Sequence, residues 1–217
     1  DSTSPRLLFT VLNWGMGHAT RSLPLIEEAR RNGWGVHVAS NGTALEFLRS
    51  QCTQASVCFH EKPNPEILYA KRGNRFKIAW QMPGFLRNIR AEKQWTQRFV
   101  AANDITHVVS DNCYGVHTPR VPCALISHQW HLPVRSVGQW AVDAFVLKQA
   151  SHFDALWTPD IHEEPGLSGK LGAPSGMPKR LERFGVLSRL SPNAPAGSWK
   201  RVGMVSGPEP HRSLMEN

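Results

Sequence analysis

The sequence lacks the cysteine and histidine spacings that hold metal ions or build a disulfide framework. Its four cysteines, Cys52, Cys58, Cys113 and Cys123, include no C-x-x-C pair. Three of them lie in or beside apolar runs, so we interpret them as small buried thiols. The ten histidines fall into no metal-ligand spacing. We therefore expect no metal and no disulfides, and a cytoplasmic setting fits this cysteine usage.

Long hydrophobic runs and several functional motifs are also missing. No apolar run is long enough to span a bilayer, and no signal-peptide pattern opens the chain. The chain has no G-x-S-x-G turn, which argues against a serine nucleophile. It has no recognised nucleic-acid-binding motif, so we expect no nucleic-acid partner.

The composition that is present favours a globular protein with an anionic partner. A chain of 217 residues that is 41% hydrophobic can bury a sizeable core, in one large domain or in one domain plus part of another. The net charge is +8. That charge suits a nucleotide diphosphate or a phospholipid surface, although it serves solubility equally well.

Short apolar runs alternate with helical patterns along most of the chain. This alternation predicts an α/β fold, with a Rossmann-like, doubly wound parallel sheet and right-handed crossovers. The expected strands cover 6–13, 35–40, 56–60, 106–110, 123–127, 155–158 and a weaker 181–187. The expected helices cover 19–31, 43–48, 76–102 (interrupted near Pro83) and 137–151.

The first strand ends in a loop with two glycines, Gly15 and Gly17, followed by His18. Glycines there let backbone N–H groups converge on an anion at the helix start, and His18 could act as a general base or donate to a phosphate. A tight turn with a bystander histidine is the alternative. A dinucleotide fingerprint would place a third glycine where Thr20 stands and an acidic residue at the end of the second strand, where the chain has Ser40. Both departures argue against NAD.

Polar residues follow most of the predicted strands. Ligands of open parallel sheets bind outside the carboxyl ends of the strands, so these residues could share one rim. Adjacent strand ends could bring Asp111 near His128, and such a pair can orient an imidazole for proton transfer. A hydrogen-bonded loop support is an equal alternative. The residues are His18, Asn41, Asp111, Asn112, His128, Gln129 and Asp160, of which Asn41 and Asp160 serve equally well as caps of helices or turns.

Basic and aromatic residues are interleaved between positions 71 and 99. Such a stretch leaves open a peripheral contact with the cytoplasmic membrane face, but aromatics of this kind are more often core and the charges a solvated face. The residues are Lys71, Arg72, Arg75, Lys77, Trp80, Phe85, Leu86, Arg87, Arg90, Lys93, Trp95 and Phe99.

A change of composition near the end of the chain predicts a domain boundary. Residues 191–198 have linker composition, and 199–217 repeat the opening pattern of a strand followed by a glycine turn. We therefore expect a first domain over 1–190, a linker over 191–198 and the start of a truncated second domain over 199–217.

Seven sequence blocks resemble, in order, a family of bacterial glycosyltransferase-like proteins of the MurG-like, GT-B type. They are Asn13–Arg21, Ser110–Gly115, Ser127–Gln129, Trp157–Asp160, Leu167–Gly169, Gly185–Arg189 and Ser206–Pro210. The resemblance implies the N-terminal, acceptor-side half of a GT-B fold, facing a donor-binding domain across a cleft. The donor it implies is a nucleotide-sugar, usually a UDP-sugar, and the nucleotide-sugar is a substrate, so no cofactor is expected.

The resemblance also implies roles for individual residues. His18 would be the general base; the mechanism that we expect has Asp111 or another carboxylate orienting it. The loop Ser206, Gly207 and Glu209 would approach the donor phosphates. The expected substrate-binding residues are Asn13, Gly15, Gly17, Thr20, Asn112, Ser127, His128 and Gln129.

We therefore expect a metal-independent glycosyltransferase that transfers a sugar to an acceptor hydroxyl, and we expect residues 1–217 alone to be inactive. The alternatives are a sugar-nucleotide epimerase or hydrolase of the same fold, and a non-catalytic sugar- or nucleotide-binding module. A dehydrogenase is the weakest of the alternatives.

Overall fold

The computed structural model describes residues 4–52, 56–63, 75–131, 139–163, 166–172 and 181–189. Its centre is a seven-stranded sheet in the order β3-β2-β1-β4-β5-β6-β7, in which every neighbouring pair is parallel. The strands are β1 (Arg6–Val11), β2 (Gly35–Ser40), β3 (Val57–Glu61), β4 (His107–Asp111), β5 (Cys123–Ile126), β6 (Ala155–Thr158) and β7 (Leu181–Arg183). The predicted α/β class and all seven predicted strands are confirmed.

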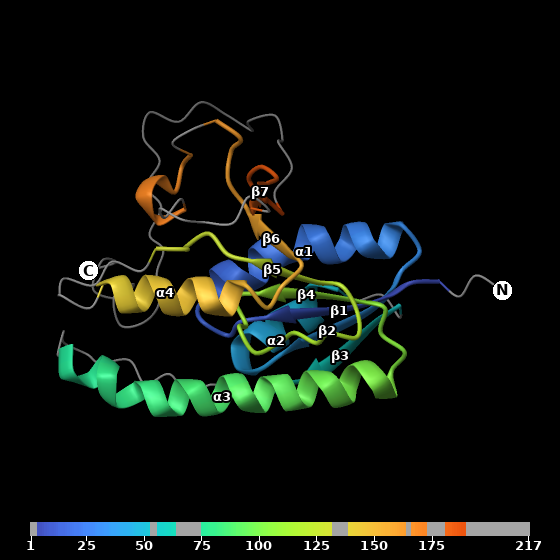
Figure 1. Cartoon of the computed structure of the whole chain (residues 1–217). Helices are drawn as coiled ribbons and strands as arrows, with labels where there is room; N and C mark the ends of the chain where they lie inside the picture. The colour runs from blue at the N-terminus through green and yellow to red at the C-terminus, as the bar shows by residue number, and fades with distance from the viewer. Residues whose placement is uncertain are drawn as a thin grey trace, which may run out of the picture.

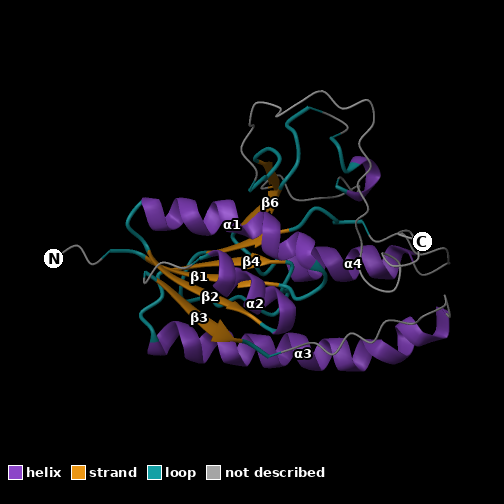
Figure 2. Ribbon diagram, turned by 180° about the vertical axis from the view of Figure 1, so that it is seen from behind, coloured by secondary structure: helices purple, strands orange, loops and turns teal. Residues whose placement is uncertain are grey.

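Helices cover both faces of this sheet (Figures 1 and 2). Buried residues of α1 and α2 form one core cluster with the sheet, whereas α3 and α4 contribute to the other. The helices are α1 (Met16–Arg31), α2 (Gly42–Gln51), α3 (Arg75–Ala102) and α4 (Gln139–Ala150), and a 3-10 turn spans Gly169–Leu171.

The central strands β1, β4 and β5 are buried on both faces along almost their whole length, which explains their continuous apolar runs. Phe9 and Val11 of β1 pack under α1, whereas Leu8 belongs to the cluster under α3 and α4. All three side chains are almost fully inaccessible. Such burial is typical of parallel sheets covered by helices, and it makes β1 a rigid base for the loop that follows it.

Several elements differ from their predicted extents. α2 continues to Gln51, and β1 and β7 end early, at Val11 and Arg183. α1 begins at Met16 rather than at Ala19, because Gly15, with φ of 73°, turns the chain directly into the helix. The predicted interruption of the long helix was wrong, since α3 runs through Pro83. Phe85 and Ile89 pack against the core just beyond it, so burial holds the helix where a backbone hydrogen bond is lost.

The predicted linker and second domain, 191–217, lie outside the described residues. All four cysteines are free thiols; Cys52, Cys113 and Cys123 are buried and Cys58 is exposed. In the part of the chain that the structure describes, every helix is too short or too polar to cross a membrane.

Candidate functional site

The carboxyl ends of β1 and β4 bring together residues that are far apart in the sequence. β1 pairs with β4 so that Val11 lies opposite Asp111. The chain then leaves β1, turns at Gly15 and enters α1, where His18 occupies the first turn. His18 Nδ1 consequently lies 3.0 Å from Asp111 Oδ1, across 93 positions of sequence.

Asp111 is the most enclosed charged group of this site, with an exposed fraction of 0%. Its Oδ1 contacts His18 and accepts a hydrogen bond from Nη2 of Arg21. Its Oδ2 accepts from Nε of Arg21 at 2.9 Å and from the hydroxyl of Ser22 at 3.0 Å. Burial alone would raise the pKa of Asp111, but the contacts with His18 and Arg21 lower it below its usual value. The carboxylate is therefore ionised at neutral pH.

His128, just after β5, joins the site through Arg21 rather than through Asp111. Nη1 of Arg21 lies 2.5 Å from His128 Nδ1, and the rings of His18 and His128 have centroids 6.1 Å apart. Burial and the charge of Arg21 lower the pKa of His128. The carboxylate that was predicted to face His128 thus contacts His18 instead, because Arg21 lies between Asp111 and His128.

Arg21 is a central member of this site that the sequence reasoning did not select. It forms the salt bridge with Asp111, and its side chain is only 14% exposed. The spacing of His18 and Arg21 could have indicated this role. The two residues are three apart, and residues three apart on a helix share a face.

Three of the predicted residues around the first turn have local roles. The side-chain oxygen of Asn13 accepts from the backbone N–H of Ala44 at 3.3 Å and from the Thr43 hydroxyl at 3.3 Å, which caps the start of α2. The hydroxyl of Thr20 donates to the carbonyl of Gly17 at 3.2 Å. Gly17 itself is exposed, with no heavy atom within 4 Å of the place a Cβ would take, so there is open space beside His18.

Three other predicted residues lie on the two following loops. Asn112 adopts a φ of 59°, and its buried Oδ1 has no hydrogen-bond partner among the described residues. Ser127 Oγ accepts from the backbone N–H of Gln129 at 3.1 Å and lies 3.2 Å from its carbonyl oxygen. Ser127 therefore closes a turn, and that turn holds His128 in place.

Asn41 and Asp160, at the ends of β2 and β6, are structural groups. The side chain of Asn41 donates to the carbonyl of Lys62 at 2.7 Å. The Asp160 carboxylate accepts from the backbone N–H groups of Ile161, Leu167 and Ser168, and from the Ser168 hydroxyl. Burial alone would raise the pKa of Asp160, but these hydrogen bonds lower it to about 2.

A cavity of about 290 Å³ opens beside the site. Arg21 and His128 line it together with Leu167 and Val186. Leu167 is 72% exposed and Val186 is 60% exposed, so large apolar side chains border the polar cluster. A molecule in this cavity would reach both the guanidinium of Arg21 and the imidazole of His128.

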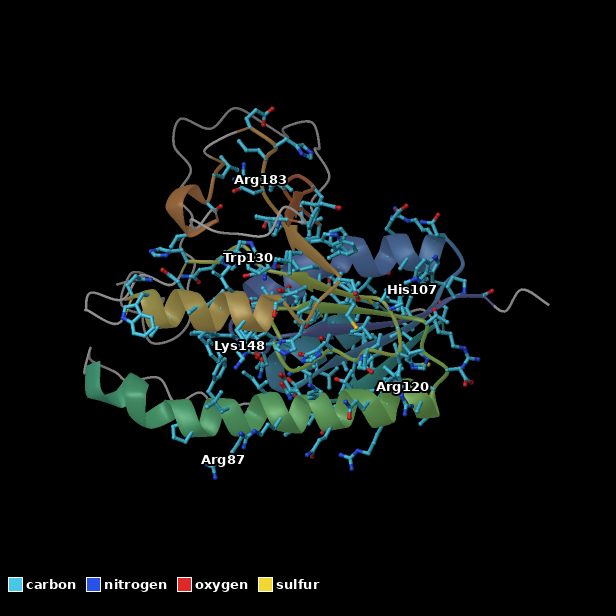
Figure 3. The ribbon with its side chains drawn as sticks, in the orientation of Figure 1. Arg87, His107, Arg120, Trp130, Lys148 and Arg183 are labelled. Carbon is cyan, nitrogen blue, oxygen red and sulfur yellow. The ribbon has the colours of Figure 1, made fainter. Side chains whose placement is uncertain are left out.

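The described part of the basic and aromatic stretch lies in α3, where the aromatic side chains pack against the core and two arginines are exposed to solvent. Phe85, Trp95 and Phe99 pack against the core. Arg87 and Arg90 are exposed, and Arg87 extends from α3 away from the rest of the molecule (Figure 3). Residues 71–74 and the side chains of 75–82 lie outside the description, and membrane contact stays a prediction.

The predicted donor-phosphate loop, Ser206, Gly207 and Glu209, also lies outside the described residues. Within the described ranges, no group of three or more histidine, cysteine, aspartate or glutamate side chains is arranged to hold a metal ion. Metal independence is therefore a prediction for the whole protein.

Comparison of the sequence with protein-family models gave no match, and comparison with curated proteins gave none either. The fold is similar to a UDP-glucosyltransferase from Polygonum tinctorium, at 14% identity and a TM-score of 0.53 over 100% of this chain and 57% of that one. It is also similar to the glycotransferase of kitacinnamycin, at 16% identity and a TM-score of 0.53 over 92% of this chain and 55% of that one.

A MurG structure from Acinetobacter baumannii matches at 10% identity over 75% of this chain and 43% of that one; its TM-score of 0.45 gives the MurG-like assignment no support. The chain spans about half the length of the solved structures it matches. It therefore has the Rossmann-like α/β fold found in one part of GT-B glycosyltransferases.

Proposed function

We propose that the full-length protein is a glycosyltransferase that moves a sugar from a nucleotide-sugar, of the UDP-sugar class, to an acceptor hydroxyl. The observation that carries this proposal is the contact between His18 and the buried, ionised Asp111 at the carboxyl edge of the sheet. The fold and the sequence blocks that resemble GT-B enzymes support it. The proposed setting is cytoplasmic, and the proposed chemistry needs no metal.

The proposed base is Nε2 of His18. In the competent form, Nδ1–H donates to Asp111, which leaves Nε2 free to accept a proton. Nε2 then takes the proton of the acceptor hydroxyl as its oxygen bonds to the anomeric carbon. The bond from that carbon to the nucleotide diphosphate breaks, and the diphosphate leaves with the electron pair. Asp111 stabilises the imidazolium that forms.

Two features of the site suit the acceptor side of this reaction. The Cβ position of Gly17, the residue before His18, faces open space, and an acceptor bound there would lie next to the residue whose imidazole is the proposed base. The buried Oδ1 of Asn112, at the same edge, has no hydrogen-bond partner among the described residues and could accept from a substrate hydroxyl that reaches it. The departing diphosphate would meet the Ser206–Gly207 loop and helix N-terminal N–H groups. Because the chain spans little more than half of the glycosyltransferase structures whose fold it shares, residues 1–217 alone are proposed to be inactive.

The test is turnover of the full-length protein with His18→Ala. General-base catalysis is typically worth about 10²–10⁴-fold, so we expect kcat to fall by that factor. Asp111→Asn should also lower kcat, because an amide oxygen stabilises an imidazolium less than a carboxylate does. Release of the nucleoside diphosphate from a UDP-sugar, with and without acceptors, measures both.

His107→Gln is the matched control, because His107 begins β4 at the end opposite Asp111 (Figure 3). Its turnover should equal that of the unaltered protein. Activity of His18→Ala within about threefold of the control would remove His18 as the base. Release of nucleotide without transfer to any acceptor would instead indicate a hydrolase.

A further inference from the structure

Arg21 touches both partners of the proposed catalytic pair. Its Nε and Nη2 bind the two oxygens of Asp111. The same Nη2 lies 2.8 Å from His18 Nδ1, and Nη1 reaches His128 Nδ1. A guanidinium is a planar group of five N–H donors with no acceptor, so each of these contacts is a donation from Arg21.

The two contacts at His18 Nδ1 require opposite proton positions. The 3.0 Å contact with Asp111 Oδ1 is a hydrogen bond only if Nδ1 carries a hydrogen. The 2.8 Å contact with Nη2 of Arg21 is one only if Nδ1 carries none. A neutral imidazole has a hydrogen on one nitrogen alone, so Nδ1 can satisfy Asp111 or Arg21 but not both.

The arrangement of charges favours the bond from Arg21. Oδ1 of Asp111 already accepts from Nη2, and Oδ2 accepts from Nε, so each carboxylate oxygen has a donor without His18. A hydrogen on Nδ1 would in contrast face an N–H of the guanidinium at the shorter of the two distances. The Nδ1–H of His18 and an N–H of Arg21 would then point at each other, next to the positive charge of the guanidinium.

We propose that Arg21 is a positioning residue that holds His18, in the unliganded site, in the tautomer with its hydrogen on Nε2. In this tautomer Nε2 is a donor and cannot accept a proton. If His18 is the base, as the proposed function has it, this tautomer has a consequence. Nε2 can accept a proton only after Nη2 of Arg21 has moved away from Nδ1. Arg21 also lines the cavity beside His128, where a ligand oxygen can take that N–H.

The test is the tautomer of His18, read from ¹⁵N–¹H correlations of the imidazole in full-length protein with ¹⁵N-labelled histidine. Spectra are recorded at alkaline pH, where ordinary histidines are neutral, and the His18 signals are assigned by their loss in His18→Gln. We expect the Nε2–H pattern in the unaltered protein. In Arg21→Lys we expect the Nδ1–H pattern, because a single ammonium can pair with Asp111 without bridging to the imidazole.

Ser22→Ala is the matched control, since it removes a hydroxyl that contacts Asp111 Oδ2 and the carbonyl oxygen of His18 and leaves both contacts at Nδ1 in place. Its His18 should keep the Nε2–H pattern. An Nδ1–H pattern in the unaltered protein, or the same tautomer in Arg21→Lys as in the unaltered protein, would overturn the proposal. The tautomer is read without substrate, so a failed transferase assay leaves this result intact, and the kcat of His18→Ala tests the function separately.

Discussion

At the scale of single residues, the carboxylates of Asp111 and Asp160 both follow or end a strand but have different hydrogen-bond partners. Asp111 is held by side chains, His18 and Arg21, that also face the open edge of the site. Asp160 is held by backbone N–H groups of its own loop. The first arrangement can change its proton positions during a reaction, whereas the second closes a loop and has a structural role.

Asp160→Asn should therefore destabilise the protein in a pH-dependent way. The pKa of Asp160 is lowered to about 2, below the usual aspartate value of about 3.9. The stability that this carboxylate contributes is therefore present above about pH 3.9 and is lost as the pH falls towards about 2. Urea unfolding should show a clear deficit of the variant at neutral pH, and a smaller deficit near the acid end of this range.

Asp104→Asn is the control for Asp160. The side chain of Asp104 is 86% exposed, and its φ of 50° suits asparagine as well as aspartate. We expect a change within about 0.5 kcal/mol. If Asp160→Asn unfolds at the same urea concentration as Asp104→Asn at neutral pH, the loop does not depend on the carboxylate.

At the scale of elements, Gly17 and Gly115 differ in whether the fold leaves room for a side chain. Gly17 lies in the first turn of α1 with open space where a Cβ would be. Gly115 lies where the chain after β4 passes α3, and a Cβ there would come within 2.3 Å of the carbonyl oxygen of Ile89. Close packing explains the second glycine, whereas the fold does not require the first.

Gly115→Ala should destabilise the protein by about 1–3 kcal/mol, because backbone must move to admit the methyl group. Gly17→Ala should leave stability unchanged or raise it by up to about 1 kcal/mol, since alanine is the better helix former. Thermal unfolding of the two variants measures the difference. Equal melting temperatures would contradict the close approach of α3 to the segment after β4.

At the scale of the whole molecule, a buried ion pair joins three parts of the fold. Lys62, just after β3, lies 2.7 Å from Glu92 of α3, and Glu92 also accepts from the backbone N–H of Gly115 at 3.2 Å. Burial alone would lower the pKa of Lys62, but Cys113 and Glu92 raise it above its usual value. Lys62 therefore stays charged, and Glu92 holds the segment that follows Asp111 through the backbone of Gly115.

Lys62→Met should cost about 3–5 kcal/mol of unfolding free energy, because it leaves Glu92 as a buried, unpaired charge. The double variant Lys62→Met, Glu92→Gln should be more stable than Lys62→Met alone, since no buried charge remains and the Gln oxygen can still accept from Gly115. Urea unfolding of the two single variants and the double variant gives the coupling energy.

The exposed pair Arg31–Glu28, with side chains 67% and 62% exposed, is the control for Lys62. Arg31→Met should cost less than about 1 kcal/mol. Purely additive effects of the two substitutions at Lys62 and Glu92 would show that the buried pair is not a coupled unit.

The strands and helices could be predicted because their causes are local. Apolar runs bounded by glycine and polar residues marked all seven strands, and helical spacing marked the four helices. The errors arose where local preference was overridden: Gly17 lies inside the first turn of α1 although glycine is a weak helix former, and core packing carries α3 through Pro83. Propensity is a weak guide when burial favours the other outcome.

The sequence by itself determined the α/β class, the parallel sheet and the expectation that His18 and Asp111 would lie at its carboxyl edge. Only the tertiary structure decided which groups meet there. His18 and Asp111 are 93 positions apart and meet because β1 pairs with β4, a pairing that depends on how the whole sheet is ordered. The same pairing brings Arg21 between Asp111 and His128, and a bidentate contact depends on distances that no local pattern encodes.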